Sequence, residues 1–363
     1  MKLAGFELYR YGLPLTAPQT LKGATFHHRE GLLLRLAGED GCVGWGETAP
    51  LPGFSDEGLD RAAAGLRELA ETVVGREATD EWVDPAGRFS RGLDQLNPTP
   101  SVRFGFELAL WNLYAASSGR MLPGLVARQP RAAVPVNGLL FGSPVEILGE
   151  ARRMKDVGYR TVKLKVGGRS LDRDVGLVRA LGEILGDAVS LRLDANRAWG
   201  FEEAAEFARG VVDVSFEYIE EPLADPAGLP ELVRQFGVSV ALDESLVGME
   251  LEALGGHRYA RAVVLKPTRL GGISRTLRVS ERVLCLGMTP VVSSAYESGV
   301  GTAALVALAA GIGESVVPAG LDTYRRLAAD VLVSPLDLAA PSVRVREVAD
   351  ASRRVDVLRL EEL

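Results

Sequence analysis

The strongest constraint on the fold is a repeated strand–helix rhythm that runs from about residue 133 to residue 319. Polar residues end successive apolar runs at positions 165, 194, 220, 243, 266 and 293, so these ends lie 29, 26, 23, 23 and 27 residues apart. Each interval is the length of one strand followed by one helix. Eight such strands predict a (β/α)8-type barrel. The alternative, a doubly wound open sheet, is disfavoured because no glycine-rich dinucleotide turn follows any strand.

The same pattern places the individual elements. The predicted strands are 133–137, 161–165, 189–194, 216–220, 238–243, 262–266, 290–294 and 315–319. The predicted helices are 144–155, 172–185, 201–211, 229–236 and 274–286. Short continuous apolar runs favour buried strands, whereas apolar residues three or four apart favour helices.

Residues 1–125 lack this rhythm and predict a separate α+β module. Its expected elements are strands at 6–13, 31–37 and 41–47 and helices at about 57–75 and 101–117. The turn Gly38-Glu39-Asp40-Gly41 joins the last two strands. The tail from about 325 to 363 also leaves the rhythm, and 343–348 alternates like a strand. We therefore expect a capping module at 1–125, to which the tail contributes, and a barrel at 126–324.

Composition and charge exclude several classes of partner. The chain of 363 residues is 47% apolar and has a net charge of −7 with no basic run, so nucleic acid and acidic membrane surfaces are poor partners. No run approaches the roughly 18 apolar residues of a membrane helix. Glu7, Arg10 and Pro14 interrupt the N-terminal segment too early for a signal peptide. We expect a cytoplasmic protein of unknown oligomeric state, with Cys42 and Cys285 as buried free thiols.

Two lysines share one face of the strand predicted at 161–165. Side chains alternate along a strand, so Lys163 and Lys165 point to the same side. Two like charges this close together repel, which lowers the pKa of one of them. A lysine that is neutral near pH 7 can act as a general base. A single K-x-K motif is common on protein surfaces, so it indicates a catalytic base only if the following strands carry matching residues.

Three of the following strands end in carboxylates, Asp194, Glu220 and Asp243. Strand C-termini converge on one face of a barrel, where active sites lie. Unpaired carboxylates there would repel one another and raise their pKa values, and a divalent cation would relieve this. Three monodentate oxygens leave octahedral positions for water and substrate, which suits Mg²⁺. Zinc is disfavoured because these positions offer no thiolate or imidazole.

A third lysine, Lys266, ends the sixth strand, nearly opposite the second strand across the barrel. A substrate carboxylate on the metal would lie between Lys266 and the pair Lys163 and Lys165. This arrangement fits removal of the proton next to that carboxylate, with the metal stabilising the enediolate as a Lewis acid. By alternation, Glu221 and Glu244 should point away and form structural pairs. Each residue taken alone is more often a salt-bridge or capping residue, but strands rarely place Lys and Asp at inward positions.

In order and spacing, these residues resemble the motifs of the muconate-lactonizing branch of the enolase superfamily. The motifs are Lys163-Leu164-Lys165, Asp194-Ala195-Asn196, Glu220-Glu221-Pro222, Asp243-Glu244-Ser245 and Lys266-Pro267. Within this branch the chain is most similar to the o-succinylbenzoate synthase family, through further motifs between about residues 40 and 325. These are Gly44-Trp45-Gly46-Glu47, Pro50-Leu51-Pro52-Gly53-Phe54-Ser55, the run from Leu191 to Trp199, Val264-Leu265-Lys266-Pro267-Thr268, Val292-Ser293-Ser294-Ala295-Tyr296-Glu297-Ser298 and Gly320-Leu321-Asp322-Thr323.

The resemblance implies an α/β fold, a modified TIM-type (β/α)7β barrel with an α+β N-terminal capping domain. It implies Mg²⁺ as cofactor, with Mn²⁺ as a substitute. The implied reaction is syn-dehydration of 2-succinyl-6-hydroxy-2,4-cyclohexadiene-1-carboxylate to 2-succinylbenzoate through an enediolate, in menaquinone biosynthesis. Sites of this superfamily are themselves the standard example of a lysine base combined with Mg²⁺ and an enediolate.

The resemblance also implies a role for each site residue. The metal ligands would be Asp194, Glu220 and Asp243. Lys165 would take the proton and return it to the departing hydroxyl, and Lys163 would keep Lys165 neutral and help to hold the carboxylate. Lys266 would stay charged and stabilise the enediolate electrostatically. Substrate-binding positions would be Asn196, Ser293, Ser294 and Gly320, of which the last three line the succinyl end of the pocket.

Two segments depart from the family pattern. Ala295 and Tyr296 stand where the family often has a third serine and an aliphatic residue, which would reshape that wall. The segment 19–30 is expected to be the mobile loop over the site, and its polar residues match no pattern. They are Lys22, His27, His28 and Arg29. A solvated histidine pair is the preferred interpretation of His27 and His28.

Three other functions remain to be weighed. The same lysines occur in N-succinyl or N-acylamino acid racemases and in dipeptide epimerases of this branch. Those reactions need a base on each face of the substrate. One enzyme could therefore catalyse both dehydration and racemisation. A Schiff-base aldolase using Lys266 is disfavoured because such a site needs no three converging carboxylates. A non-catalytic binder is disfavoured because the site residues are all intact.

Overall fold

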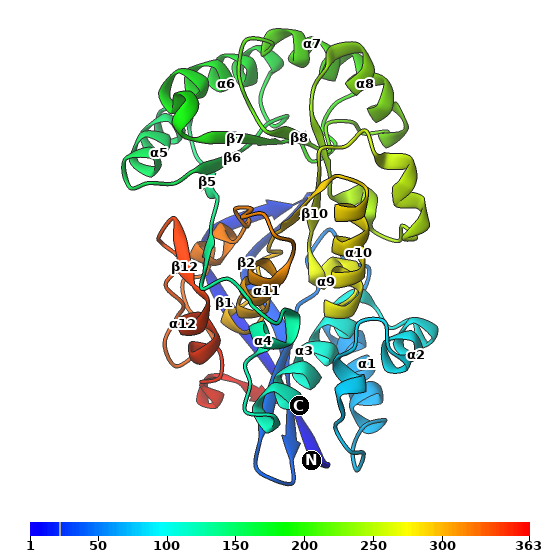
Figure 1. Cartoon of the computed structure of the whole chain (residues 1–363). Helices are drawn as coiled ribbons and strands as arrows, with labels where there is room; N and C mark the ends of the chain where they lie inside the picture. Colours follow the sequence, from blue (N-terminus) through cyan, green and yellow to red (C-terminus); the bar gives the residue numbers. More distant parts are fainter. Residues whose placement is uncertain (22) are drawn as a thin grey trace.

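A parallel sheet forms the wall of a barrel in the upper half of the molecule (Figure 1). The computed structural model describes residues 1–21 and 23–363. Within these residues the sheet has seven strands in the order β11-β10-β9-β8-β7-β6-β5, so neighbouring strands follow the chain order. The strands are β5 (Gly138–Leu140), β6 (Thr161–Lys165), β7 (Ser190–Asp194), β8 (Tyr218–Glu220), β9 (Val240–Leu242), β10 (Ala262–Leu265) and β11 (Thr289–Val292). The predicted rhythm is confirmed over this range.

Main-chain atoms of Ala319 and Gly320 close the barrel in place of a regular eighth strand. Ala319 bridges Val136, and Gly320 bridges Ser293, both in parallel register. The N–H of Gly320 donates to Val292 O, and the N–H of Ser294 donates to Gly320 O, each at 2.9 Å. The predicted strand at 315–319 is therefore wrong in extent, since Pro318 lacks an N–H for a ladder and pairing begins only after it.

The first predicted strand is also displaced. Residues Ala133–Pro135 form β4, which pairs antiparallel with β12 (Ser342–Arg344) outside the barrel sheet. The first barrel strand is instead β5, beside β6. The apolar run at 133–137 predicts a strand, but an apolar run does not indicate which sheet that strand joins.

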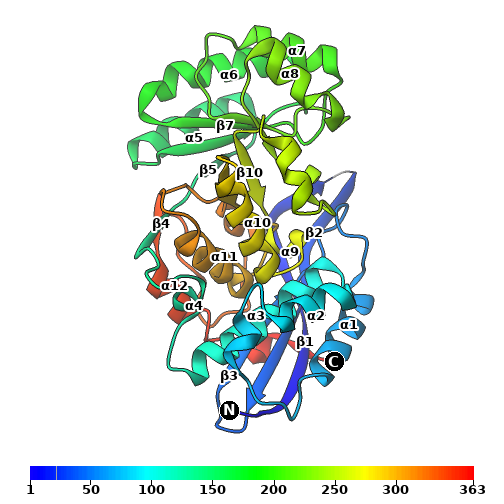
Figure 2. The ribbon, with the colours of Figure 1, turned by 45° about the vertical axis from the view of Figure 1, so that its right-hand side comes forward.

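Helices cover the outside of the barrel strands (Figure 2). They are α5 (Pro144–Asp156), α6 (Leu171–Leu185), α7 (Phe201–Gly210), α8 (Leu229–Phe236), α9 (Pro267–Leu270), α10 (Ile273–Cys285) and α11 (Gly299–Gly311). The start of α5 shows how the sequence sets a boundary, because Ser143 and Glu146 form a capping box around Pro144. Between β9 and β10 the chain makes two short 3-10 segments instead, Glu244–Leu246 and Glu252–His257.

An antiparallel sheet in the order β13-β1-β2-β3 forms the capping module. Its strands are β1 (Leu3–Leu21), β2 (Ala24–Gly38), β3 (Val43–Thr48) and β13 (Glu361–Glu362), and its helices are α1 (Leu59–Glu71), α2 (Arg88–Leu96), α3 (Pro100–Ser117) and α4 (Leu122–Val126). Helix α3 packs directly on β3, since a β-carbon on Gly44 or Gly46 would overlap main-chain oxygens of α3. The motif Gly44-Trp45-Gly46-Glu47 therefore allows helix and strand to approach closely.

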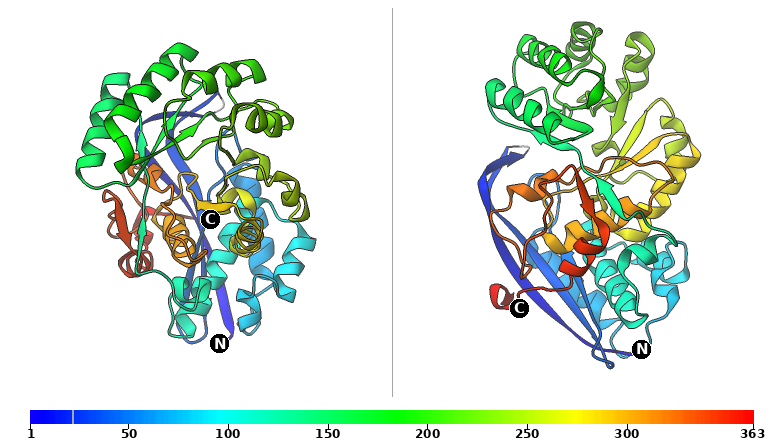
Figure 3. Two further views of the ribbon diagram at one scale, coloured as in Figure 1. Left: turned by 45° about the horizontal axis from the view of Figure 1, so that its top comes forward. Right: turned by 60° about the vertical axis from the view of Figure 1, so that its left-hand side comes forward.

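The segment 19–30, expected to form a loop, is instead part of a β-hairpin. Gln19 pairs with Phe26 and Thr20 with Thr25, so β1 and β2 continue as a long hairpin, after an irregularity between Pro14 and Gln19. Figure 3 shows this hairpin, in blue, running from the N-terminal end of the molecule up to the barrel. His27 and His28 are exposed on it. Lys22 lies outside the described residues.

The C-terminal tail returns to the capping sheet, where Tyr9 pairs with Glu362 and Arg10 with Glu361. The strand predicted at 343–348 is largely wrong, since β12 ends at Arg344 and α12 spans Val345–Ala351. Val345 and Val348 are both buried on one helix face. The domain limits at 125/126 and 324/325 stay a prediction.

Two further sequence expectations concern exposure and membranes. Cys285, the last residue of α10, is exposed, and Cys42 is half-buried, so the expected burial of both thiols is wrong. Both cysteines are free, as predicted. No helix in the described part of the chain is long and apolar enough to cross a membrane.

A fully buried carboxylate joins the capping module to the barrel. Glu47 of β3 accepts hydrogen bonds from Tyr11 Oη at 2.5 Å, Ser298 N at 2.8 Å, Ser298 Oγ at 2.6 Å and Gly301 N at 2.7 Å. Ser298 and Gly301 lie at the start of α11, where the helix dipole favours a negative charge. Every lone-pair direction of Glu47 is thus occupied by a fixed donor.

Candidate active site

A pocket of about 660 Å³, including space open to solvent, lies at the C-terminal ends of the barrel strands and beneath the loop after β3. Its lining contains most of the predicted site residues, namely Lys163, Lys165, Asp194, Asn196, Lys266, Ser293, Ser294 and Gly320. Glu220 and Asp243 are bonded to lysines of this lining. The structure therefore brings all the predicted residues together.

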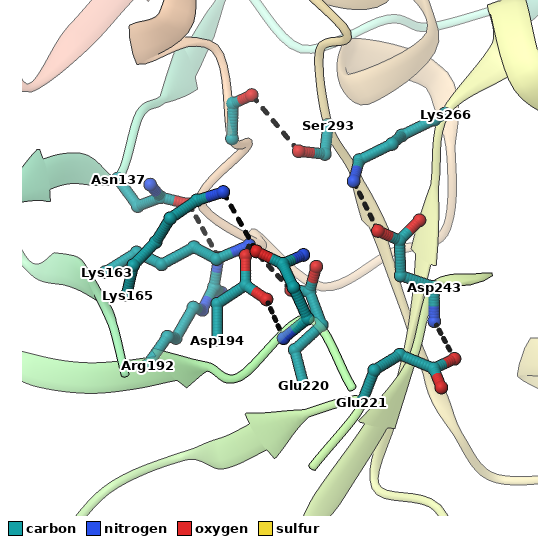
Figure 4. A network of polar contacts seen from close by, with 12 residues as sticks. Asn137, Lys163, Lys165, Arg192, Asp194, Glu220, Glu221, Asp243, Lys266 and Ser293 are labelled. Atoms are coloured by element: carbon teal, nitrogen blue, oxygen red, sulfur yellow. Dashed lines mark hydrogen bonds and ion pairs between the residues drawn. The ribbon is translucent and has the colours of Figure 1, made fainter. Parts of the chain in front are cut away.

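Lys163 and Lys165 extend from β6 on one side of the pocket (Figure 4). Lys163 Nζ lies 2.8 Å from Asp194 Oδ2 and 2.7 Å from Glu220 Oε2. Burial alone would lower the pKa of Lys163, but these two carboxylates raise it well above its ordinary value. The ammonium of Lys163 is therefore held between two acids, a pairing that strand alternation alone does not predict.

Lys165 lies beside an amide instead of a carboxylate. Its Nζ donates to Asn196 Oδ1 at 2.9 Å, and Asn196 Nδ2 donates to Glu244 Oε1 at 3.3 Å. Asn196 has a φ of +44°, in the left-handed region that asparagine tolerates better than most residues. The turn after β7 thus places the Asn196 side chain between Lys165 and Glu244, and it is hydrogen-bonded to both.

Lys266 approaches from the opposite side of the pocket (Figure 4). It follows β10, and its Nζ contacts Asp243 Oδ2. Arg269 Nη1 lies 3.5 Å from the other oxygen of Asp243. Burial would lower the pKa of Lys266, but Asp243 and then Glu220 raise it. Two lysine groups therefore face one cavity from opposite sides, with acids on the strands between them.

The three acids differ in their protonation energetics. Burial, and after it the nearby Asp194, raise the pKa of Glu220 to about 8. For Asp194, burial is outweighed by Lys163 and then Lys165, so its pKa is lowered. For Asp243, burial is outweighed by Lys266 and then Arg269. The rise expected for unpaired carboxylates therefore does not apply to the two aspartates, because lysines pair with both of them.

The oxygen donors of the site fit a hard divalent cation. Glu220 Oε1 and Glu244 Oε2 are buried without a hydrogen-bond partner, which is costly for a carboxylate. Among residues 1–21 and 23–363, no three acidic, histidine or cysteine side chains gather as a metal-binding group. Lys163 and Lys266 contact oxygens of these carboxylates, and a bound cation would compete with the lysines for the same oxygens. The residues thus have the chemistry for Mg²⁺, while their present contacts are with ammonium groups.

Glu221 has the structural role expected of it. Its Oε1 accepts from Asp243 N at 2.9 Å and Ser245 N at 2.7 Å, and its Oε2 accepts from Ser245 Oγ and Arg197 Nε, each at 3.0 Å. This carboxylate fixes the turn that carries Asp243. Glu244 lies behind the site residues, as the sequence also allowed: its Oε1 accepts from Asn196 Nδ2 at 3.3 Å, and Asn196 in turn binds Lys165, whereas its Oε2 has no partner.

The serines and Gly320 form the wall where the barrel closes. Ser294 Oγ donates to Gly320 O at 2.9 Å, and Ser293 Oγ lies 3.3 Å from the same oxygen. A β-carbon on Gly320 would lie 2.6 Å from Ser293 Oγ. Because the N–H of Gly320 also serves the ladder, its main chain is already hydrogen-bonded on both sides.

The pocket has an apolar wall, of which the sequence indicated Ala295 and Tyr296 but not Leu51 and Phe54. It consists of Leu51, Phe54, Ala295 and Tyr296, which pack together and line the pocket. Arg269 lies over the ring of Phe54, with 4.7 Å between the guanidinium carbon and the ring centroid. The sequence signal was the motif from Pro50 to Ser55, which supported the family resemblance but was not connected to the strand ends.

Two family models match this chain. Residues 146–349 match the family described as enolase C-terminal domain-like, and residues 3–113 match the MenC N-terminal domain. The first match covers more than half of the chain. The fold and the site therefore define an enzyme of the enolase superfamily.

Curated relatives narrow this class. The o-succinylbenzoate synthase of Yersinia enterocolitica is 35% identical over 348 residues, covering 94% of this chain and 97% of that protein. The chloroplastic protein PHYLLO of Arabidopsis thaliana is 32% identical, and this chain spans 23% of its length. The chain belongs to the o-succinylbenzoate synthase family, whose enzymes are carbon–oxygen lyases of the hydro-lyase type.

Solved structures agree with the fold. The muconate lactonizing enzyme from Pseudomonas fluorescens, complexed with muconolactone, has a TM-score of 0.86 at 25% identity, covering 99% of this chain and 98% of that chain. The dipeptide epimerase from Enterococcus faecalis V583, complexed with Mg and a dipeptide, has a TM-score of 0.85 at 21% identity, covering 99% and 100%. These likenesses support the modified barrel with a capping domain.

Proposed function

We propose that this enzyme eliminates water from 2-succinyl-6-hydroxy-2,4-cyclohexadiene-1-carboxylate in a Mg²⁺-dependent syn reaction that gives 2-succinylbenzoate, a step of menaquinone biosynthesis. The observation that carries the proposal is the opposition of Lys165 and Lys266 across strand-end carboxylates, in a chain of the o-succinylbenzoate synthase family. The substrate is a small carboxylate with an acidic C–H beside the carboxyl group, which suits a pocket with lysines on both sides.

The residues that would hold Mg²⁺ are Asp194, Glu220 and Asp243. The ion would supply Lewis-acid stabilisation of the negative charge that develops on the substrate carboxylate. The unpartnered Glu220 Oε1 supports this assignment, as does the all-oxygen donor set. Mn²⁺, which takes similar ligands, would substitute.

The lysines would carry the proton transfer and the charge. Lys165 removes the proton next to the carboxylate and returns it to the hydroxyl that leaves, so that one C–H and one C–O bond break and water departs. An enediolate lies between these two steps. Lys163 would place a positive charge on the same face of β6 as Lys165 and help to hold the substrate carboxylate. Lys266 stays protonated and stabilises the enediolate from the opposite side.

The substrate-binding positions remain those expected from the sequence. Ser293, Ser294 and the main chain of Gly320 would line the succinyl end, and Asn196 would lie beside the carboxylate end next to Lys165. The two serine hydroxyls now donate to Gly320 O, so each can rotate toward a substrate acceptor. The apolar wall would face the ring.

The second candidate is racemisation or epimerisation of N-succinyl or N-acyl amino acids or dipeptides. Lysines on both faces support it, because racemisation needs a base on one side and an acid on the other. The N-succinyl Arg/Lys racemase from Bacillus cereus has a similar fold, with a TM-score of 0.82 at 20% identity. One enzyme with both activities is compatible with this site.

The test follows the cyclohexadiene absorbance of the proposed substrate, with Mg²⁺ and with a chelator. We expect fast loss of absorbance with Mg²⁺ and none with the chelator. Failure to turn over with Mg²⁺ would reject the dehydratase. N-succinyl amino acids would then be assayed for exchange of the α-proton in deuterated water, and exchange that needs Lys165 and Lys266 would establish the racemase.

A further inference from the structure

One buried arginine connects both segments that form the apolar wall of the pocket. Arg29 of β2 is only 1% exposed. Its Nε donates to Tyr296 O at 3.0 Å, its Nη1 to Pro50 O at 2.7 Å and to Glu30 O at 3.0 Å, and its Nη2 to Ala49 O. One guanidinium therefore binds carbonyls from three chain segments.

Two of these carbonyls lie next to pocket residues. Ala49 and Pro50 lead directly into Leu51, whose carbonyl in turn receives the N–H groups of Phe54 and Ser55 at 3.0 and 2.9 Å. Another of the four carbonyls belongs to Tyr296, which itself lines the pocket. Arg29 thus lies behind the wall that Leu51, Phe54, Ala295 and Tyr296 present to the pocket.

Tyr296 is held in a backbone conformation that its side chain disfavours. Its φ is +63°, in the left-handed region, where an aromatic residue is strained. Such a conformation persists only where the surroundings enforce it. Besides the bond from Arg29, the Tyr296 hydroxyl donates to Gln19 Oε1 at 3.1 Å, and its ring meets Phe26 edge-on at 6.0 Å. All three contacts come from the β1–β2 hairpin.

The guanidinium suits this position and an ammonium does not. Its N–H groups form a rigid planar fork that can serve acceptors in several directions at once. In the described part of the chain, no carboxylate lies within ion-pair distance of Arg29, so carbonyl dipoles balance its charge. Because Arg29 touches none of the lysines or acids of the site, it can act only through the wall.

We propose that Arg29 is a positioning residue that fixes Tyr296 and the 49–55 loop against each other and so sets the shape of the apolar end of the substrate pocket. The substrate class concerned is a carboxylate whose ring or apolar body rests on this wall, and this part rests on the proposed function. Arg29 affects how well substrate binds, while the barrel strands hold the groups that do the chemistry.

The test compares Arg29→Lys with Arg131→Lys. Arg131 is a matched control because it also donates to main-chain carbonyls, those of Ala309, Ala310, Ile312, Gly313 and Ser315 at the end of α11, and it does not line the pocket. For Arg29→Lys we expect KM to rise by about 10-fold with kcat changed by less than about 3-fold, the pattern of lost ground-state binding. For Arg131→Lys we expect KM to be unchanged.

A second measurement does not depend on which substrate is correct. Hydrogen exchange followed by mass spectrometry should be faster at 49–55 and 293–298 in Arg29→Lys, and unchanged there in Arg131→Lys. If the wild-type enzyme fails to turn over the cyclohexadiene, the proposed function falls while this comparison still tests Arg29. Faster exchange with an unchanged KM would make Arg29 a purely structural residue and overturn the inference, as would unchanged exchange.

A third variant covers the case in which Arg29→Lys does not fold. Tyr296→Ala keeps the main-chain carbonyls that Arg29 binds and removes the ring from the wall, together with its contacts to Gln19 and Phe26. We expect its KM to rise with little change in kcat, and exchange to accelerate at 293–298 but not at 49–55. An unchanged KM in folded Tyr296→Ala would overturn the inference.

Discussion

The described part of the chain contains two buried groups of carboxylates, one at the junction of cap and barrel and one at the strand ends, and they differ in how completely they are hydrogen-bonded. At the junction of cap and barrel, Glu47 receives four fixed donors, and Glu297 receives Thr268 Oγ1 at 2.7 Å and Ala295 N at 2.6 Å. At the strand ends, Glu220 and Glu244 each keep one buried oxygen without a partner. The first group holds the structure together, and the second has binding capacity left for a ligand.

This difference has a general physical basis. A buried carboxylate with all its acceptor sites filled adds rigidity, whereas one with an empty site bears a desolvation cost that a ligand can relieve. At the strand ends, lysines offset part of that cost, since they pair with Asp194 and Asp243. Substitutions in the two groups should therefore have different effects, on catalysis in one and on stability in the other.

The largest effect is expected from the lysines. Lys165→Ala and Lys266→Ala should each lower kcat by about 10²–10⁴-fold, the usual contribution of a positioned acid or base, while the fold is kept. Turnover would be followed by the cyclohexadiene absorbance, and folding by circular dichroism. Full activity in either variant would contradict the role given to that lysine.

At the junction of cap and barrel, Glu47→Gln should chiefly lower stability. The amide nitrogen would face N–H donors of α11 or the Tyr11 hydroxyl, so we expect a loss of about 2–5 kcal/mol in the free energy of unfolding. Urea denaturation would measure it. The control is Glu231→Gln on the exposed surface of α8, which should leave the denaturation midpoint nearly unchanged. Equal midpoints in both variants would remove the distinction between the two groups.

The third prediction concerns metal affinity. Asp243→Asn should weaken Mg²⁺ binding by at least about 10–100-fold, the range for losing even an outer partner of a metal site. Titration calorimetry of the wild type and the variant would measure it, with Asp322→Asn as a control, since Asp322 lines the same pocket outside the proposed ligand set. An unchanged affinity in Asp243→Asn would remove Asp243 from that set.

The smallest effect is expected from a solvent-accessible link between the same two modules. Asp94 of α2 contacts Arg103 of α3 at 2.5 Å and Arg278 of α10 at 2.9 Å. Burial would raise the pKa of Asp94, but Arg278 and then Arg103 lower it below its ordinary value. Because Asp94 is about one-third exposed and screened by solvent, Asp94→Asn should cost about 0.2–1 kcal/mol at pH 7.

The pH dependence of this link has a definite sign. A lowered pKa in the folded state means that the stabilisation is complete above the unfolded value of about 3.9 and disappears as the pH falls through the folded value. The difference in unfolding free energy between wild type and Asp94→Asn should therefore shrink below about pH 4. A difference that grows on acidification would contradict the ion-pair explanation.

The sequence predicted the strand ends well because two independent signals coincide there. Apolar runs set the period, and polar residues at 165, 194, 220, 243 and 266 interrupt those runs at matched positions. Strand twist and barrel closure then bring the strand ends together, independently of the conformations of the loops. This is why residues more than 100 positions apart, such as Lys163 and Lys266, could be placed opposite each other.

Other parts of the site leave no such periodic signal. The carbonyl partners of Arg29 lie between 1 and 267 positions away, and main-chain acceptors have no side-chain identity to recognise. The hairpin at 19–30 was obscured by Pro14, Pro18 and Gly23, which favour a loop. The pairing of Lys163 with two acids depends on side-chain rotamers that strand alternation cannot determine.

Closing the barrel with Gly320 limits how evolution or engineering can change this pocket. The same main-chain atoms complete the cylinder and receive the serine hydroxyls, and a β-carbon there would lie 2.6 Å from Ser293 Oγ, so the Ser293 hydroxyl would have to move. A substitution at 320 would therefore disturb the scaffold and the pocket together. Leu51 and Phe54 of the apolar wall come from the loop after β3 and take no part in closing the barrel, so libraries aimed at new substrates should diversify these two residues and leave residue 320 unchanged.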